Sequence, residues 1–258
     1  TWVMQITNFS TGFANCIHFF DANNGVATGD PNGGYFEIYT TTNGGDNWVR
    51  VPSSNIPAPL PGEMGITSSF AAYNNNFWFA TFGAATGQRI IGSTDRGYTW
   101  TLLTTFPIPS NITPSLEFRD SLHGIFIGNA YLIFRTSNGG ITWTTDTLPS
   151  WVEFIGSPSY VPGTLATYVA TVIGRSGEEE LYISLVSTDD GATWKRMDSW
   201  QSSSFNAPSA QEWTSPNSGW MCLVEKGIYK WPGYTGKHLW RAGNSLKYRS
   251  IELGTAAD

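Results

Sequence analysis

An eight-residue phrase occurs four times in this chain of 258 residues. Each copy has Ser or Thr first, Asp or Asn third, Gly fifth, Thr or Asn seventh and Trp last. A repeat with a long period shapes the whole fold, so it outweighs any local signal in the sequence. The four copies are residues 41–48, 93–100, 136–143 and 187–194.

The spacing of the tryptophans predicts a β-propeller. The four that end the phrases, together with Trp2 and Trp240, are separated by 46, 52, 43, 51 and 46 residues. A period of about 40–50 residues with several short strands is typical of propeller blades, each a four-stranded antiparallel sheet. The 15% aromatic and 13% charged residues, with 28 glycines, favour short strands and tight turns over helices. We therefore predict an all-β propeller.

The phrases also predict the blade boundaries within a single domain, residues 1–258. A Gly-rich turn preceded by Asp or Asn is typical of a tight hairpin, so each phrase should join the third strand of a blade to the fourth. Two terminal segments, 1–5 and 246–253, are expected to be extra closing strands. Five or six blades, or a fragment of a larger propeller, remain open. The complete repeats are expected at residues 14–51, 66–103, 114–146, 151–197 and 210–241.

The phrase at 93–100 and 187–194 resembles the Asp-box, or BNR repeat, of sialidases, xyloglucan-acting endoglucanases, sortilin-type receptors and photosystem II assembly factors. Its coupling to a Phe-x-Asp-x-x-x-Gly phrase is most similar to the assembly-factor repeat, which is widespread in secreted bacterial proteins. The resemblance implies a secreted, cell-surface or periplasmic protein whose box residues are structural. Those residues are Asn43, Trp48, Asp95, Trp100, Asn138, Trp143, Asp189 and Trp194.

An enzyme of the sialidase type would require an arginine triad, a Tyr–Glu pair and an Arg-Ile-Pro sequence before the first box. This chain has no Arg-Ile-Pro, and Arg50, Arg96, Arg135 and Arg196 lie in or beside the predicted outer strands. No Ser-His-Asp order, zinc-ligand spacing or phosphate loop occurs either. We predict no metal and no cofactor, and a non-catalytic protein is favoured.

When the expected innermost strands of the repeats are aligned, one position is polar in every repeat, and we call this set of residues the polar column. Since both faces of a blade are buried by its neighbours, such groups must reach channel water or be paired. Three interpretations remain: a solvated lining with ion pairs, a site for a ligand or cation, and glycoside hydrolysis by Glu117, Glu153 or Glu212. The aligned residues are His18, Ser69, Glu117, Glu153 and Glu212, with Arg249 in the partial sixth strand.

Loops supply the other candidates. Connections between blades should gather on the face opposite the eight-residue phrases, and they include residues 52–65 with four prolines, residues 106–114, Trp151 and Trp200. Exposed Pro and Trp on a rigid scaffold bind peptides or sugars. The alternative is that Trp151 and Trp200 are buried and fill space in the core.

Charge and cysteine content narrow the partners. A net charge of -6 argues against nucleic acid, five lysines argue against a polybasic membrane contact, and no apolar run reaches the length of a membrane span. Cys16 and Cys222 are expected as buried thiols, with a bridge between them as the alternative. We predict a protein or glycan ligand at the loop face and channel mouth. A glycoside hydrolase, or an assembly factor within a larger complex at a membrane, are the alternatives.

Overall fold

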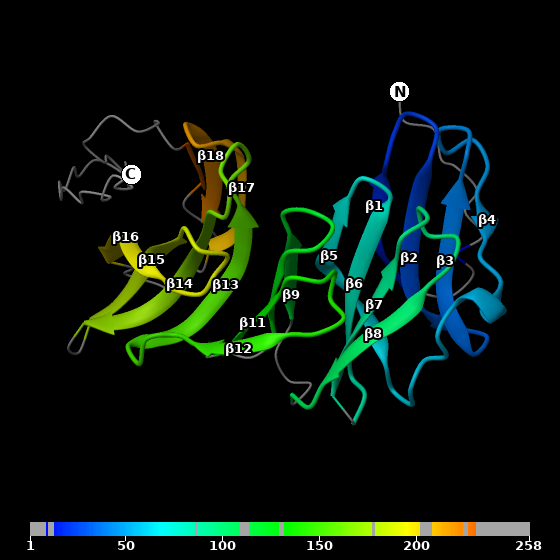
Figure 1. The fold of residues 1–258 in the computed structure, drawn as a ribbon, viewed down its shortest axis with the longest axis horizontal. Coiled ribbons are helices and arrows are strands. Elements are labelled where there is room, and N and C mark those ends of the chain that lie inside the picture. The colour runs from blue at the N-terminus through cyan, green and yellow to red at the C-terminus, as the bar shows by residue number, and fades with distance from the viewer. Residues whose placement is uncertain are drawn as a thin grey trace. The chain divides into compact units, whose positions relative to one another are not determined.

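The computed structural model describes eight stretches of the chain, and within them the fold is all-β (Figure 1). One 3-10 turn, η1 (Ser53–Asn55), is present, and no described residue belongs to a helix long and apolar enough to cross a membrane. The expected closing strands, Trp2, Trp240 and Arg249 lie outside the described residues. These are 9, 13–85, 87–108, 114–128, 132–176, 179–201, 208–223 and 227–230.

Two compact units divide the chain. The first (1–129 with 134–145) contains two complete sheets and most of a third; the second (130–133 with 146–258) contains the fourth and fifth. The first sheet comprises β1 (Ala14–Phe19), β2 (Gly25–Asn32), β3 (Tyr35–Thr41) and β4 (Val49–Arg50). The second comprises β5 (Met64–Tyr73), β6 (Asn76–Phe82), β7 (Gln88–Ser93) and β8 (Thr101–Phe106). The third comprises β9 (Ser115–Phe118), β10 (Gly124–Ile127), β11 (Leu132–Thr136) and β12 (Thr144–Thr147).

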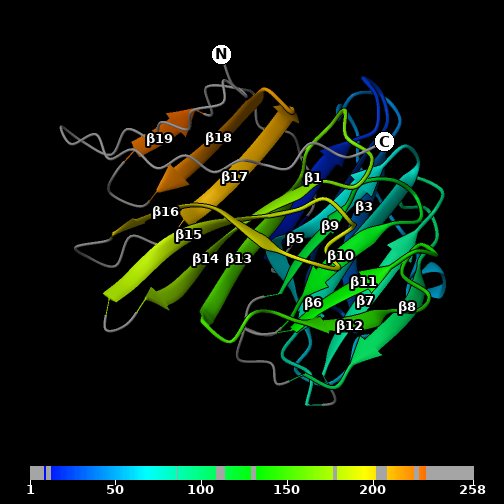
Figure 2. The ribbon, with the colours of Figure 1, turned by 60° about the vertical axis from the view of Figure 1, so that its left-hand side comes forward.

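The second unit continues the pattern. Its fourth sheet comprises β13 (Val152–Tyr160), β14 (Tyr168–Ser176), β15 (Glu179–Ser187) and β16 (Lys195–Gln201). Its fifth sheet has three described strands, β17 (Pro208–Ser215), β18 (Ser218–Leu223) and β19 (Gly227–Lys230). In every sheet consecutive strands pair antiparallel, and the first strands of neighbouring sheets within a unit lie together, as Figure 2 shows for β1, β5 and β9 and for β13 and β17. The predicted fold class is confirmed.

All four eight-residue phrases adopt one turn geometry between the third and fourth strands. The fourth residue has φ between 56° and 74°, and the glycine after it has φ between 80° and 94°. The first-position hydroxyl accepts the N–H of that glycine at 2.8–3.0 Å. The third-position side-chain oxygen accepts the seventh N–H at 2.9–3.0 Å. Local hydrogen bonds therefore account for the conserved spacing of Ser/Thr, Asx and Gly within the phrase.

The tryptophan at the end of the turn packs between two sheets. Trp100 lies with its ring centroid 5.7 Å from Phe77 and 5.3 Å from Phe79, in a buried cluster that includes Val26 and Ile38 of the first sheet. Its ring N–H donates to the carbonyl of Gly97 in its own turn at 2.8 Å. This indole is thus oriented by its turn and buried against the neighbouring sheet.

The next pair of sheets repeats this arrangement. Trp143 packs edge-on against Phe106, Phe118 and Phe126 at 5.6–6.2 Å between centroids. Trp78 of the second sheet stacks on Phe118 at 3.9 Å and donates its ring N–H to the carbonyl of Gly139. The core of the first unit is therefore a series of aromatic layers between sheets.

Neither cysteine forms a disulfide. Cys16 lies in β1 with its Sγ 2.8 Å from the Thr28 hydroxyl, and burial raises the pKa of its thiol to about 11. Cys222 lies in β18 and is half-buried. The structure therefore contains thiols at both positions and no bridge between them.

Replacing Trp100 by Ala should lower the free energy of unfolding by about 3–5 kcal/mol, because it opens a cavity between two sheets. Trp48→Ala removes the same side chain from a half-exposed position and should lower it by less than half as much. Urea unfolding of both variants measures the difference. Equal losses would contradict the role of Trp100 between the sheets.

Candidate functional site

Strand pairing defines which inner-strand residues are equivalent. In the first sheet Thr41, the first residue of the turn, pairs with Gly25, which pairs with Phe19 on β1. The corresponding residue in the third sheet, reached by the same steps, is Phe118 on β9. In the second and fourth sheets the same steps lead to Ala72 and Tyr160. In the fifth sheet the equivalent residue is Trp213 on β17, which pairs with Gly219. The residues that directly precede these five equivalent positions are His18, Ala71, Glu117, Ser159 and Glu212.

Two members of the predicted column are therefore wrongly aligned. Ser69 lies two residues before its aligned position and Glu153 lies six before. The cause is the length of the connection between the first two strands. It is five residues in the first and third sheets, two in the second and seven in the fourth. Glu153 therefore does not belong to the polar column.

The remaining column residues have unlike surroundings. His18 is half-buried with its ring 4.8 Å from Phe20, and burial lowers the pKa of the imidazole. Ser69 is fully buried, and its hydroxyl has no hydrogen-bond partner within the described ranges. Glu117 is half-buried in the first unit. Glu212, in the second unit, is an exposed residue. Partial desolvation of its carboxyl group nevertheless raises the pKa of that group.

The predicted tryptophans and metal ligands add little to this column. Trp151 is half-buried just before β13, whereas the side chains of Trp200 and Glu153 are outside what the structure describes. Within the described part of the chain, no group of three or more His, Cys, Asp or Glu side chains is placed to hold a metal ion. The column thus remains a set of separate side chains.

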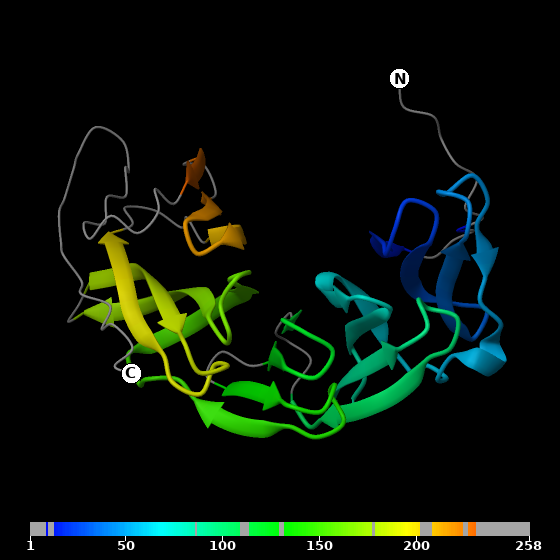
Figure 3. The same ribbon diagram turned by 45° about the horizontal axis from the view of Figure 1, so that its top comes forward.

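A better-defined site lies in residues 52–65, which we call the proline loop: it is the connection from β4 to β5 together with the first two residues of β5 (η1 is its short coil in Figure 3). The connection begins beside the eight-residue turn of the second sheet, where Asn55 bonds Trp100 and Tyr98, and reaches the start of β7 at Arg89, so it lies only in part on the face opposite the turns. Ala58, Pro61 and Gly62 are exposed, and Met64 is 40% exposed. The loop therefore presents a proline-rich surface to solvent.

A buried ion pair between β7 and the proline loop anchors the loop to the second sheet. Arg89 of β7 donates from Nε to Glu63 Oε1 at 2.7 Å and from Nη2 to Oε2 at 2.5 Å. The two side chains are 6% and 0% exposed. Glu63 also accepts the Thr81 hydroxyl and the Leu60 N–H, and Arg89 donates to the Ala58 carbonyl at 2.9 Å. Such satisfied pairing is what a buried charge requires.

Both ends of the loop have further anchors. The Asp30 carboxylate on β2 accepts the N–H of Gly65 and the side-chain amide of Asn15, each at 3.0 Å. In η1, the Asn55 carbonyl accepts the N–H of Trp100 at 2.8 Å, and its side chain donates to the Tyr98 carbonyl. The loop is thus tied to the first and second sheets at three points along its length.

Sequence reasoning selected this loop for its prolines but missed Glu63 and Arg89. A usable signal was present, since Arg89 directly precedes the apolar pair Ile90 and Ile91 of β7. A cation at a position whose neighbours are all buried requires a carboxylate nearby. Which carboxylate it meets depends on the pairing of β5 to β8.

No protein-family model matches the chain, and no curated protein matches it. Solved structures are similar in fold. One is YCF48 bound to D1 peptide, at 18% identity and a TM-score of 0.52, covering 88% of this chain and 67% of that chain. Another is the WD40 β-propeller domain of Doa1, at 11% identity and a TM-score of 0.52, covering 85% and 65%. A prolyl endopeptidase structure gives 12% identity and a TM-score of 0.58, covering 93% of this chain and 36% of that one.

These likenesses, all under 20% identity, concern the fold alone. Together with the repeated four-stranded antiparallel sheets they define the class of protein: a β-propeller. Since propellers host unrelated activities, function has to be argued from the site.

Arg89→Met should lower the free energy of unfolding by about 3–5 kcal/mol, because it leaves the Glu63 carboxylate buried without its partner. Adding Glu63→Leu to the same chain should recover at least half of that loss. Arg96→Met, which removes an exposed ion pair with Asp21, serves as the control and should cost less than about 1 kcal/mol. Urea unfolding measures all three; a double variant no more stable than Arg89→Met would contradict the pairing.

Proposed function

We propose that this chain is a non-catalytic propeller that binds a protein partner through the proline loop. The observation that carries the proposal is the buried Arg89–Glu63 pair, which fixes an exposed loop in one conformation. A loop that is already ordered loses little conformational entropy on binding, so more of its contact energy appears as affinity. The fold thus presents this segment much as rigid scaffolds present binding loops.

The chemistry of the loop suits an extended peptide or a flexible protein segment. Prolines have no N–H, so their carbonyls are available while the segment cannot pair as a regular strand. Met64 adds a flexible apolar contact at the edge of the loop. Because buried Arg89 neutralises the charge of Glu63, the exposed surface of the proline loop should recognise a ligand by shape and apolar contact more than by charge.

A similar propeller, YCF48, has been solved with D1 peptide bound, so the fold can hold a peptide in that protein. This likeness supports, for the present chain, a peptide or protein ligand over a glycan. The resemblance of the repeat suggests two narrower proposals. The protein partner would belong to a complex at a membrane, which this chain helps to assemble, and the chain would act outside the cytoplasm.

Met64→Glu should abolish recognition by the proline loop, because it places a charge in the apolar contact. Peptides displayed on phage are selected against the wild-type chain, and their affinities are then measured by calorimetry. The selected peptides should bind Met64→Glu at least about tenfold more weakly. Ile141→Glu, on the exposed third turn, is the matched control and should bind within about twofold of wild type. Peptide binding unaffected by Met64→Glu, or binding only to a glycan array, would contradict the proposal.

Glycoside hydrolysis remains the second candidate, favoured by one observation. The raised pKa of Glu212 is a property of general acids in glycosidases. We expect no turnover of synthetic glycosides, because no partner carboxylate is aligned with Glu212 in the described residues of its sheet. Turnover that Glu212→Gln removes and the exposed-site control Asp46→Asn retains would establish a hydrolase instead.

A further inference from the structure

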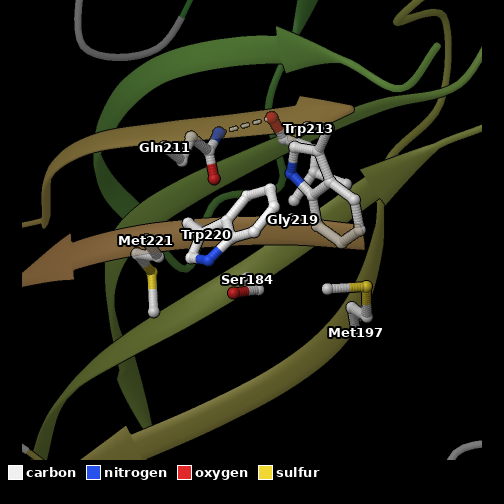
Figure 4. A pocket seen from close by; sticks show the side chains of 8 residues that line it. Ser184, Met197, Gln211, Trp213, Gly219, Trp220 and Met221 are labelled. Atoms are coloured by element: carbon white, nitrogen blue, oxygen red, sulfur yellow. Dashed lines mark hydrogen bonds between the residues drawn. The ribbon is translucent and has the colours of Figure 1, made fainter. Parts of the chain in front are cut away.

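The hollow between the fourth and fifth sheets leaves no room for a ligand (Figure 4). Gln211 on β17, in its lining, donates its side-chain amide to the Val169 carbonyl at 2.6 Å, and Trp213 and Trp220 also line it. The space that remains is about 10 Å³, roughly that of one water molecule. The first unit, in contrast, presents a reactive pair of residues in an open turn.

That pair is an asparagine followed by glycine. The backbone nitrogen of the glycine attacks the side-chain Cγ of the asparagine, the nitrogen gives up its proton, ammonia leaves, and a succinimide ring forms. Water then opens the ring at either carbonyl and leaves aspartate or isoaspartate. Glycine favours the reaction because it has no side chain to crowd the ring. Four such pairs occur in this chain: Asn24-Gly25, Asn32-Gly33, Asn43-Gly44 and Asn138-Gly139.

Two of the four pairs lie in eight-residue turns, where hydrogen bonds hold both reacting groups. The N–H groups of Gly44 and Gly139 each donate at 2.9 Å to a carbonyl in the connection between the first two strands of the same sheet. The side-chain oxygens of Asn43 and Asn138 each accept a hydroxyl and a backbone N–H within the turn. An attack would first have to break these bonds, so the turns protect both asparagines.

The pair at Asn24 is protected by packing. Gly25 is buried at the start of β2, and a Cβ there would lie 3.0 Å from the Phe19 ring. The Asn24 side chain also donates to both carboxylate oxygens of Asp21, at 2.8 and 2.9 Å. A succinimide ring at this position would therefore displace packed groups.

The pair at Asn32 is open. It lies at the hairpin turn from β2 to β3, where Gly33 and Gly34 have φ of 69° and 89°. No described residue accepts the N–H of Gly33, and no atom lies within 4 Å of the place that its Cβ would take. The nitrogen is therefore available for attack, and the ring has room to form.

We propose that Asn32 is a deamidation site whose product destabilises the hairpin from β2 to β3. The Asn32 side-chain amide donates to Glu37 Oε1 at 3.1 Å, and the Glu37 side chain is fully buried. A carboxylate at position 32 has no proton to donate, and it places a second negative charge beside a buried one. Arg50 does not replace the lost donor: its Nη1 lies 4.0 Å from Glu37 Oε1, and its Nη2 donates to the Asn32 carbonyl at 2.7 Å.

The same change would be tolerated in the eight-residue turns. Aspartate already occupies the third position of the second and fourth turns, where Asp95 and Asp189 each accept a backbone N–H and a threonine hydroxyl. The fold thus blocks deamidation where its product fits and leaves it open where its product does not. This proposal does not rest on the proposed function of the proline loop.

The first test follows the four asparagines in the native full-length chain. The protein is incubated at mildly alkaline pH, digested and examined by mass spectrometry, with enzymatic methylation of isoaspartate as a second readout. Asn32 should convert at least about tenfold faster than Asn43 or Asn138, because no hydrogen bond has to break first. Conversion of Asn43 or Asn138 as fast as that of Asn32, or an intact Asn32, would overturn the proposal.

The second test removes the fold. Asn32, Asn43 and Asn138 are each followed by two glycines, so their local sequences are matched. In urea the three should convert within about twofold of one another, since the unfolded chain lacks the protecting bonds. A preference for Asn32 that persists in urea would place its cause in the sequence and overturn the structural argument.

The third test measures the effect of the product. Asn32→Asp should lower the thermal unfolding midpoint by roughly 3–8 °C. Asn43→Asp is the matched control and should shift it by less than about 2 °C. Adding Glu37→Gln to Asn32→Asp supplies a donor again and should recover at least half of the loss. Equal shifts for the two single variants, or a double variant no more stable than Asn32→Asp, would overturn the stated role of the bond between Asn32 and Glu37.

Discussion

The packing of Trp100 and Trp143, which the second and third turns direct into the space between two sheets, is the interaction on which the first unit depends. Hydrogen bonds within the turn orient its backbone, and the indole N–H of Trp100 or Trp143 bonds a carbonyl of the same turn. The ring is then buried against aromatic residues of the adjoining sheets. The hydrogen bonds within each turn therefore engage the side chains of its first and third residues.

The proline loop depends on a different constraint, the burial of two opposite charges. Removing Arg89 and Glu63 from water is costly, and the pair persists because its hydrogen bonds reach Thr81 and two backbone groups of the loop. Those backbone bonds exist only in one loop conformation. The desolvated pair thus specifies the shape of an exposed segment, which links an electrostatic feature to the proposed binding surface.

Sequence reasoning succeeded where hydrogen bonds are local and failed where strand register decides. The turn at 93–100 is readable because Ser93 and Asp95 bond groups at most four residues away. The inner-strand column is not readable, since the connections before the second strands vary from two to seven residues. A shift of that kind moved Ser69 from an expected channel position to a fully buried one. The candidate site was therefore found only in part.

The sequence by itself determined the all-β class, the order of strands and the four turns, because each depends on contacts between residues close in the chain. The tertiary structure alone decided that Glu63 meets Arg89, 26 residues away, under the proline loop. It also decided that Ser69 is buried, because a two-residue connection sets where β5 pairs with β6. Both depend on how strands pair and sheets stack, which local spacing does not specify.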